Sequence, residues 1–431
     1  MSAKGPDAVS PARRCAYAVI TRVFAQGAYA DAALQAEAAG LDARDRALAM
    51  RLAYGTIQRS STLDHFIAQL AERPPGRLDQ PLRESLRLGL YELLYLQGQP
   101  EYATVAEAVE LAKRHARAGH GLVNAVLRRA AREGAASLLG GLSDETPELA
   151  SVKHSHPEWL ARMWWGALGP EQARALMAAD NEPGEFALRG NTLVADAGLL
   201  AARLPVKSHG DERIPEALVL DEPFDLHSSE LFSGGALIAQ SRAAMLVSRE
   251  LDPQPGERVL DLCAAPGGKC THLAALMEAR GELVAVERDR RRAGALVRTA
   301  QRMHAGNVRV EVADAALARA EEPFHRVLVD PPCSGLGTLQ ARPDLRWRIR
   351  ESALAELSQL QLAILAAGAG ALRPGGLLVY STCTISPDEN ERVIDAFLDS
   401  RRDFGLEGAA LQTMPHRDHT AGFFIARLRR S

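Results

Sequence analysis

Two cysteines of the chain lie in motifs whose residue types could carry out covalent chemistry. Cys333 lies in "LVDPPCSGLG", behind two prolines, and Cys383 lies in "VYSTCTISPDENE". A thiolate is a strong nucleophile, and its addition to carbon 6 of a pyrimidine makes carbon 5 electron-rich enough to react. The alternative for a lone cysteine is packing as a small buried hydrophobe. Because both cysteines follow apolar runs typical of strands, the pair favours chemistry.

A loop of small residues follows another apolar run, in "VLDLCAAPGGKCTHLAAL" (residues 259–276). The order strand, Gly-rich loop, helix directs backbone N–H groups and a helix N-terminus at a ligand. A P-loop needs G-x-x-x-x-G-K-[ST], but the residue five before Gly268 is Cys263, and Lys269 is followed by Cys270. The dinucleotide motif G-x-G-x-x-G is also missing. The loop therefore suits a ligand with a carboxylate and an amine rather than a pyrophosphate.

Acidic residues end four of the apolar runs: Asp261, Glu287, Asp314 and Asp330. The carboxyl ends of parallel strands border one crevice, in which ligands bind. There Glu287 can accept hydrogen bonds from ribose hydroxyls, and Asp314 can accept one from an adenine amino group. For any single acid, a role at the surface of the strand end is the alternative. As a set without a metal-ligand pattern, the acids predict S-adenosylmethionine as the cofactor and no metal.

The residue after the two prolines distinguishes two kinds of base methylation. Transfer to an adenine amino group favours an aromatic residue at this position, to stack the flipped base. This chain has Cys333 there. A thiol instead suits methylation of carbon 5 of cytosine. We assign Cys15 and Cys270 to packing.

The elements that must position these residues lie in the C-terminal part of the chain. Short apolar runs alternate with helical segments, and strands that are apolar on both faces are typical of a parallel sheet covered by helices. A last apolar run, residues 422–428, is compatible with an antiparallel closing strand. We therefore predict an α/β catalytic domain over residues 229–431. Its strands are expected at residues 258–262, 283–287, 308–313, 325–330 and 376–382.

Two further regions precede this domain. Residues 1–140 have apolar side chains spaced by three and four, as in "RESLRLGLYELLYL", and are predicted to form an all-α bundle. Residues 141–228 combine a helix pair with the short strands "FALRGNTL" and "EALVLDEPF", and are predicted to form a small α/β connector. The predicted architecture is therefore multidomain.

Composition and charge limit the class of protein. The chain has 431 residues, 47% hydrophobic and 24% charged, which is enough for two or three globular domains. We recognise no signal peptide and no membrane span, and expect a soluble cytoplasmic protein. The five cysteines have no C-x-x-C spacing, so we expect neither zinc fingers nor disulfides. Residues 1–140 hold 18 basic and 14 acidic residues within a net charge of −3, which is compatible with a polyanionic partner.

Three motifs resemble those of a known family. "DLCAAPGGK", "DPPCSGLG" followed by "RPDLRW", and "STCTISPDENE" look like the signature motifs of RNA cytosine carbon-5 methyltransferases. The helical "LRLGLYELLYL", "TVAEAVELAKR" and "GLVNAVLRRAARE" are similar to the NusB-like RNA-binding domain of the Fmu/Sun (RsmB) type, which acts on 16S ribosomal RNA. The resemblance covers nearly the whole chain. It implies a Rossmann-like class I S-adenosylmethionine-dependent methyltransferase domain behind a NusB-like bundle.

The resemblance also implies a role for each motif residue. Cys383 would be the nucleophile, and Cys333 would help to resolve the adduct by helping to remove the carbon-5 proton. Asp330 would hold the base near ring nitrogen 3 and would also border the cofactor. Glu287 would bind the ribose of the cofactor and Asp314 its adenine. The loop that would wrap the methionine part of the cofactor consists of Cys263, Ala264, Ala265, Pro266, Gly267, Gly268 and Lys269.

The segment "ARPDLRWRIR" (residues 341–350) follows the Cys333 loop and combines four arginines with Trp347. Arginines beside a site can neutralise RNA phosphates while an aromatic ring stacks an unpaired base. The alternative is an amphipathic surface helix with Trp347 turned inward. We expect RNA contact by Arg342, Arg346, Trp347, Arg348 and Arg350.

Other functions remain open at this point. The same chemistry on transfer RNA is one alternative. A non-catalytic NusB-like RNA-binding factor is another, against which the intact Cys333, Cys383 and Asp330 argue. DNA methylation fits poorly, because DNA cytosine methyltransferases use a cysteine after a proline as nucleophile and would not require Cys383. We expect a monomer that methylates 16S ribosomal RNA before the subunit is complete, without membrane association.

Overall fold

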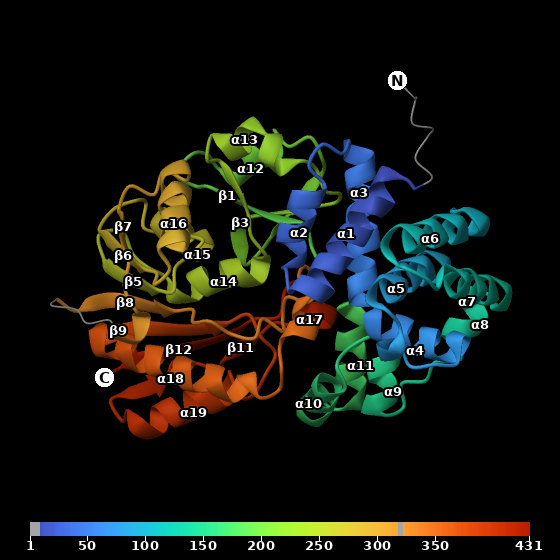
Figure 1. The fold of residues 1–431 in the computed structure, drawn as a ribbon. Coiled ribbons are helices and arrows are strands. Elements are labelled where there is room, and N and C mark those ends of the chain that lie inside the picture. The colour runs from blue at the N-terminus through green and yellow to red at the C-terminus, as the bar shows by residue number, and fades with distance from the viewer. Residues whose placement is uncertain (1–8, 318–321) are drawn as a thin grey trace. The chain divides into compact units, whose positions relative to one another are not determined.

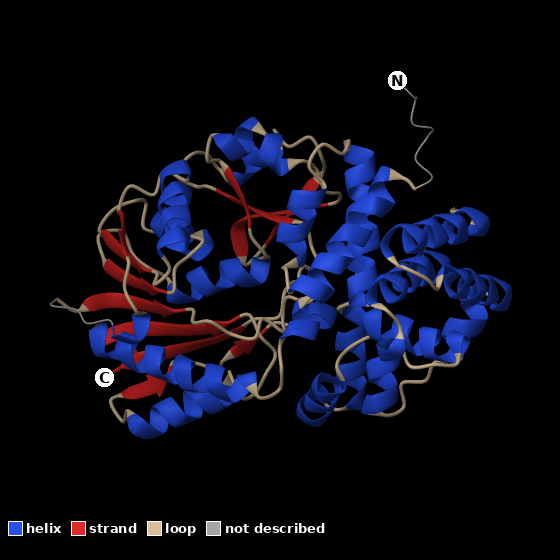
Figure 2. Cartoon of the chain, viewed as in Figure 1, coloured by secondary structure: helices blue, strands red, loops and turns tan. Residues whose placement is uncertain are grey.

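The computed structural model describes residues 9–317 and 322–431, which form two compact units. One unit contains the described residues up to Glu182 together with Leu339–Ile349. The other contains Pro183–Thr338 and Arg350–Ser431. Figure 1 labels the elements, and Figure 2 shows that the strands all belong to the second unit within the described part of the chain.

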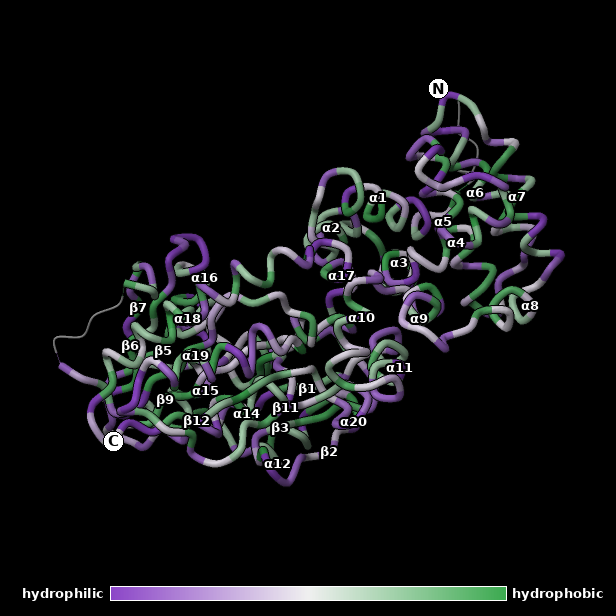
Figure 3. The backbone as a smooth tube through the Cα atoms, turned by 90° about the horizontal axis from the view of Figure 1, so that it is seen from below, coloured by the Kyte–Doolittle hydropathy of each residue, from purple (hydrophilic) through white to green (hydrophobic). Residues whose placement is uncertain are grey.

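The helical unit has one apolar core, formed by residues that recur every three or four positions along its helices. On α5, Leu86 and Leu90 are both fully buried. Figure 3 shows hydrophobic and hydrophilic residues alternating along α1, as expected of an amphipathic helix. The helices are α1 (Pro11–Gln26), α2 (Ala30–Glu37), α3 (Ala43–Gln58), α4 (Ser60–Ala71), α5 (Gln80–Tyr95), α6 (Glu101–His115), α7 (His120–Glu133), α8 (Ala135–Gly140), α9 (Pro147–Lys153), α10 (Glu158–Leu168), α11 (Pro170–Ala179) and α17 (Leu345–Arg348).

Helices α9 to α11 lie in the same compact unit as α1 to α8. The backbone N–H of Ser61 donates to Ser155 Oγ at 3.1 Å, and Thr62 Oγ1 donates to the carbonyl of Val152, so the start of α4 is tied to the end of α9. Trp164 of α10 is fully buried. The division between the two compact units follows Glu182, whereas the domain boundaries predicted from the sequence lie at residues 140 and 228.

The second unit begins with a small antiparallel sheet in the order β2-β3-β1-β4. The two short strands predicted for the connector are thereby confirmed, as β1 and β3. The elements are β1 (Ala187–Gly190), α12 (Ala197–Ala201), β2 (Ser208–Asp211), β3 (Ile214–Leu220), α13 (Glu230–Ser233) and β4 (Leu237–Ala239).

A larger sheet has the order β10-β12-β9-β8-β5-β6-β7, with β11 paired to β12. Strands β7, β6, β5, β8 and β9 are parallel, whereas β12 pairs antiparallel with β9 and closes the sheet as predicted. The chain order reverses between β5 and β8, the place where Rossmann-like sheets bind ligands. The strands are β5 (Arg258–Leu262), β6 (Glu282–Val286), β7 (Val308–Glu311), β8 (Phe324–Val329), β9 (Leu372–Thr382), β10 (Phe404–Leu406), β11 (Leu411–Gln412) and β12 (Phe424–Arg430).

Both faces of this sheet are covered by helices, and alternate strand residues enter two separate cores. Val259 of β5 packs with the helices on one face and Leu260 with those on the other. Figure 1 shows α14, α15 and α16 on one side of the sheet and α18 and α19 on the other. The helices are α14 (Arg242–Leu251), α15 (Gly268–Leu276), α16 (Arg290–Arg302), α18 (Ala353–Ala371), α19 (Glu391–Ser400) and α20 (Pro415–Asp418).

Helix α18 is the one helix of the described residues that is long and apolar enough to cross a membrane, by length and composition alone. Its residues Ile364, Leu365 and Ala369 are buried in the core beneath the sheet. About a third of its apolar window is buried in this way.

Candidate active site at the carboxyl edge of the parallel sheet

The loop between β5 and α15 turns sharply at Gly267. This residue has φ +108°, and a Cβ at this position would lie 2.9 Å from a leucine side chain of α16. The backbone N–H of Ala264 donates to the carbonyl of Val286 at 3.0 Å, and Arg292 Nη2 donates to the carbonyl of Ala265 at 2.9 Å. Neighbouring elements therefore fix the path of the loop, and its small side chains leave room for a ligand.

Acidic residues border the space beyond this loop. Cys263, Glu287 and Asp314 line one pocket together with Pro332 of the Cys333 loop. Glu287 is 3% exposed. Asp314 is exposed and lies in the loop after β7, whereas the sequence predicted it at the end of that strand. Asp261 is 1% exposed, and no group in the described part of the chain bonds to either of its carboxylate oxygens.

The buried Asp261 carboxyl, which has no hydrogen-bond partner, shows whether S-adenosylmethionine fits this site. Burial raises the pKa of this carboxyl well above its ordinary value, and the nearby Asp330 carboxylate adds to the effect. A buried polar group without a partner costs free energy, which an ammonium group of a ligand would offset. S-adenosylmethionine carries such a group at its methionine end, so the residues present fit this cofactor.

Asp330, directly after β8, connects α15 with β9. Lys269 Nζ donates to Asp330 Oδ2 at 2.8 Å, and Ser381 Oγ donates to Asp330 Oδ1 at 2.9 Å. Burial alone would lower the pKa of the Lys269 ammonium, but the Asp330 carboxylate outweighs it, and the pKa lies above its ordinary value. Lys269 also interacts electrostatically with Cys383 and lies over the ring of Phe423, 4.9 Å from the ring centroid. A charged pair therefore lies beside the second cysteine.

The two cysteines singled out in the sequence meet at the carboxyl ends of β8 and β9. The sulfur atoms of Cys333 and Cys383 are 3.3 Å apart, within hydrogen-bonding distance for two thiols. The bond with Cys383 and burial raise the pKa of the Cys333 thiol well above its ordinary value, and the charges of Cys383, Glu389 and Asp330 raise it further. This shift disfavours a thiolate at Cys333.

The predicted site residues thus form two neighbouring groups at one edge of the sheet. Cys263, at the start of its loop, shares a pocket with Glu287 and Asp314, and Lys269, at the end of that loop, bonds to Asp330 near the two thiols. All five cysteines are described, and none forms a disulfide. Within residues 9–317 and 322–431, no group of three or more His, Cys, Asp or Glu side chains could hold a metal ion.

Arg346 is turned into the helical unit, so the RNA contact predicted for it is wrong, whereas Trp347 is half-buried. Arg346 is fully buried and donates to the carbonyls of Ser155 and Asp180 at 3.0 Å each. Trp347 Nε1 donates to the carbonyl of Ile57 at 2.7 Å. Burial lowers the pKa of Arg346 to about 10. Both side chains satisfy backbone carbonyls at helix ends, because buried polar groups require hydrogen-bond partners. The fully buried guanidinium of Arg346 cannot reach phosphates.

Sequence reasoning missed two buried polar residues that support the site. Arg189 of β1 donates to the carbonyl of Gly268 at 2.7 Å and to Thr271 Oγ1 at 2.8 Å, and so holds the N-terminus of α15. Glu389 accepts hydrogen bonds from the Cys333 loop. Each of these charged residues lies in or beside an apolar run, and this is the signal that could have revealed them. A charged residue in an apolar run is buried only where a specific partner neutralises it.

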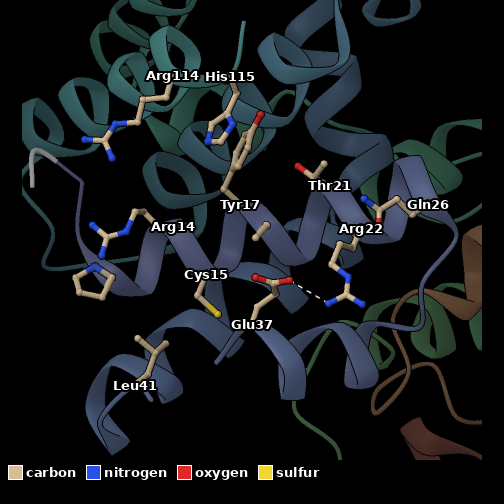
Figure 4. Close-up of a pocket in the computed structure, with 12 residues that line it drawn as sticks. Arg14, Cys15, Tyr17, Thr21, Arg22, Gln26, Glu37, Leu41, Arg114 and His115 are labelled. Atoms are coloured by element: carbon tan, nitrogen blue, oxygen red, sulfur yellow. Dashed lines mark hydrogen bonds and ion pairs between the residues drawn. The ribbon is translucent and has the colours of Figure 1, made fainter. Parts of the chain in front are cut away.

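An open hollow lies in the helical unit between α1, the end of α2 and the end of α6 (Figure 4). The rings of Tyr17 and His115 stack with their centroids 4.6 Å apart. Figure 4 shows the guanidinium groups of Arg14 and Arg114 on the same side of the hollow. His115 is exposed, and burial followed by the Arg114 charge lowers its pKa. The hollow therefore offers a neutral aromatic ring beside positive charges, a combination suited to single-stranded nucleic acid.

Three known families match successive parts of the chain. Residues 10–132 match the NusB family. Residues 156–227 match the ferredoxin-like domain of RsmF/B-like methyltransferases. Residues 248–429 match the family described as 16S rRNA methyltransferase RsmB/F.

Curated relatives match over nearly the whole chain. The probable ribosomal RNA small subunit methyltransferase B of Synechocystis sp. is 34% identical over 97% of this chain and 99% of its own length. The ribosomal RNA small subunit methyltransferase B of Klebsiella pneumoniae is 34% identical over 89% of this chain and 90% of its own length.

Solved structures agree with this assignment. The crystal structure of PH0851 has a TM-score of 0.80 at 29% identity and covers 98% of this chain and 99% of that protein. A methyltransferase homolog protein from Pyrococcus horikoshii has a TM-score of 0.61 at 28% identity, over 67% of this chain and all of that protein. With a NusB domain before its Rossmann-like domain, this S-adenosylmethionine-dependent rRNA methyltransferase belongs to the 16S rRNA methyltransferase RsmB/F family.

Proposed function

We propose that this enzyme methylates carbon 5 of one cytosine in 16S ribosomal RNA and does so through a covalent bond between Cys383 and the base. The observation that carries the proposal is the pair of thiols 3.3 Å apart beside the ion pair of Lys269 and Asp330. Methylation of an exocyclic amine needs no thiol, whereas carbon 5 of cytosine needs a nucleophile at carbon 6. The names of the relatives, which specify the small-subunit ribosomal RNA, support the substrate.

Attack begins at Cys383, whose thiolate adds to carbon 6 of the cytosine while the displaced electron pair moves toward ring nitrogen 3. Asp330 holds the base near this nitrogen. The Lys269 ammonium, 2.8 Å from Asp330, balances negative charge on that side of the ring. S-adenosylmethionine supplies the methyl group when bound, and carbon 5 of the adduct is the atom that receives it. Glu287 and Asp314 line the pocket suited to the adenosine part.

Release of the product requires loss of the proton on carbon 5. Once Cys383 is a thioether, it no longer competes for the proton of Cys333, and the largest cause of the raised pKa of Cys333 is removed. Cys333 can then pass its proton to water and accept the proton from carbon 5. The carbon–sulfur bond to Cys383 breaks as the double bond re-forms, which leaves 5-methylcytosine and the Cys383 thiolate.

The helical unit is the proposed docking element for the RNA. Its hollow brings Arg14 and Arg114 next to the His115 ring, which is compatible with a phosphate pair and an unpaired base. We also propose that the enzyme is a cytoplasmic monomer. Its substrate would be RNA that is not yet packed into a complete subunit, because the target cytosine must leave its stack to reach Cys383.

Bisulfite sequencing of ribosomal RNA from cells with and without the protein tests the proposal. One 16S cytosine should resist conversion only when the protein is present. Resistance that changes in transfer RNA instead would favour that substrate. No changed cytosine, together with no calorimetric binding of S-adenosylmethionine, would favour a non-catalytic RNA-binding factor. Protein-free 16S ribosomal RNA should be methylated faster than complete small subunits.

A further inference from the structure

Glu389 lies between the loops that carry the two thiols and is fully buried. Its Oε1 accepts from the backbone N–H of Ser334 at 2.8 Å and from Gln361 Nε2 at 2.9 Å. Its Oε2 accepts from Ser334 Oγ. Ser334 is the residue directly after Cys333, so one carboxylate fixes the backbone and the side chain next to this thiol.

The neighbouring Asn390 forms hydrogen bonds to the segment around Cys383 in the same way. Asn390 Oδ1 accepts from Thr382 Oγ1, and Asn390 Nδ2 donates to the carbonyl of Thr384 at 3.1 Å. Thr382 and Thr384 flank Cys383 on both sides. The Tyr380 hydroxyl donates to the carbonyl of Glu389 at 2.6 Å, which ties the pair of residues back to β9.

Direct links between the two loops complete this arrangement. Ser334 Oγ lies 2.7 Å from Thr384 Oγ1, and the backbone N–H of Gly337 donates to the carbonyl of Cys383 at 3.0 Å. A buried network in which nearly every polar atom has a partner is rigid, because each lost bond would expose an unsatisfied group. The separation of the two sulfur atoms is therefore set by the residues that flank them.

The charge of Glu389 also acts on the thiols. Cys333 faces Cys383 from β9, Asp330 from the end of β8, Glu389, and the Tyr380 phenol, whose own pKa is raised by burial and by Cys333. Burial raises the pKa of Glu389, although the hydrogen bonds from Ser334 oppose that shift. A carboxylate near Cys333 disfavours a second negative charge there.

We propose that Glu389 is a positioning residue for the methyl transfer: it holds the two thiols at their working separation and places a negative charge beside Cys333, so that Cys383 is the attacking sulfur. The inference rests on the proposed covalent function. It adds the residue that makes two adjacent cysteines differ in reactivity. Glu389 touches neither the base nor the cofactor in this scheme and acts through the Cys333 loop.

The test compares Glu389→Gln with the matched control Glu391→Gln, an exposed glutamate two residues further on. The pH dependence of iodoacetamide alkylation is measured separately for each cysteine by mass spectrometry, without RNA. In Glu389→Gln the alkylation midpoint of Cys333 should move down by about one pH unit, because a like charge has been removed. The kcat should fall at least about tenfold with the S-adenosylmethionine Kd unchanged. Glu391→Gln should match the wild type in every respect.

A shorter carboxylate separates the effect of the negative charge on Cys333 from the effect of the hydrogen bonds to Ser334. Glu389→Asp keeps the negative charge but withdraws it from Ser334, so the Cys333 midpoint should stay close to that of the wild type while kcat still falls. If Glu389→Gln leaves both the Cys333 midpoint and kcat unchanged, the inference is wrong. If Glu389→Gln does not fold, Ser334→Ala decides: it removes one link to Glu389 and should lower kcat, and full kcat in this variant would overturn the inference.

The two proposals fail in different ways. RNA containing 5-fluorocytosine should trap wild-type protein as a stable adduct, because the carbon-5 proton that must leave is replaced by fluorine. An absence of that adduct in the wild type refutes the covalent function. A trapped wild-type adduct with no difference between Glu389→Gln and Glu391→Gln refutes the role of Glu389 alone.

Discussion

The sulfur atoms of Cys333 and Cys383 lie 3.3 Å apart, although 50 residues separate them in the chain. Each cysteine follows one of two adjacent parallel strands, β8 and β9, whose carboxyl ends meet at the same edge of the sheet. Because their surroundings differ, two chemically identical side chains are expected to respond differently to substitution.

Substitution of the two cysteines should produce opposite results with RNA. Cys383→Ala removes the proposed nucleophile and should lower turnover on the order of 10³-fold or more. Cys333→Ala should still form the bond to carbon 6 but release it slowly, so a protein–RNA species should survive denaturing electrophoresis. Cys15→Ala, in the helical unit, is the control and should show neither effect. Full turnover by Cys383→Ala, or no retained species with Cys333→Ala, would contradict the respective role.

Replacement of Lys269 should slow the chemical step. Lys269→Gln leaves Asp330 without its cation and removes positive charge near Cys383, so the single-turnover rate should fall at least about tenfold. Lys207→Gln makes the same change at an exposed site and should have no effect. Calorimetry with S-adenosylmethionine separates a loss of binding from a loss of rate. An unchanged single-turnover rate would show that the ion pair has no part in the attack.

Alanine at Gly267 should weaken cofactor binding more than alanine at another glycine with a left-handed backbone. Gly267 has φ +108°, and its added Cβ would lie 2.9 Å from a side chain of α16. Gly256 has φ +90°, with nothing within 4 Å of an added Cβ, so Gly256→Ala carries the backbone strain without the clash. We expect Gly267→Ala to raise the S-adenosylmethionine Kd at least about tenfold, whereas Gly256→Ala should only lower the melting temperature. Equal S-adenosylmethionine Kd values for the two variants would show that the geometry of the Gly267 loop does not affect cofactor binding.

Stability should decline as the pH falls from 6.5 to 4 because of His272. This imidazole is 1% exposed, its Nε2 lies 2.5 Å from Glu216 Oε1, and burial lowers its pKa to about 4. The unfolded chain, with a histidine pKa near 6.5, binds more protons in this range, so the stabilisation is full above pH 6.5 and is lost on acidification. The loss amounts to about 3 kcal/mol.

A variant isolates this contribution. His272→Gln should lower the melting temperature at pH 7.5, where the neutral imidazole is in place, but should flatten the decline between pH 6.5 and 4. Melting curves of both proteins at several pH values provide the measurement. Parallel declines would show that another group titrates.

The hollow in the helical unit should contribute charge to RNA binding. Arg14→Gln combined with Arg114→Gln should weaken binding of 16S ribosomal RNA and reduce the slope of log affinity against log salt by about 1.4, because each phosphate contact on a single strand adds about 0.7. Arg132→Gln, an exposed arginine at the end of α7, should leave the slope nearly unchanged. Filter binding at several salt concentrations provides the measurement, and identical slopes for all variants would place the RNA elsewhere.

The alternation of apolar runs and helical segments was enough to predict the parallel sheet and the edge at which Glu287, Asp330 and Cys383 gather. This works because a residue that directly follows a parallel strand must lie at the carboxyl edge, whatever the rest of the fold does. The antiparallel closing strand was predicted on the same local basis. Asp314 was misplaced by a few residues, because strand ends are the least determined part of such a pattern.

Contacts between distant residues decided the rest. The run of arginines around Trp347 has the composition of an RNA-binding segment, yet Arg346 is buried because carbonyls from residues 155 and 180 converge on it. Nor does the sequence show that Glu389 receives the backbone N–H of Ser334, 55 residues earlier. Local patterns determine which side chains reach a sheet edge. Only the packed structure determines which buried polar groups find partners there, since desolvated charges are tolerated only where those partners converge.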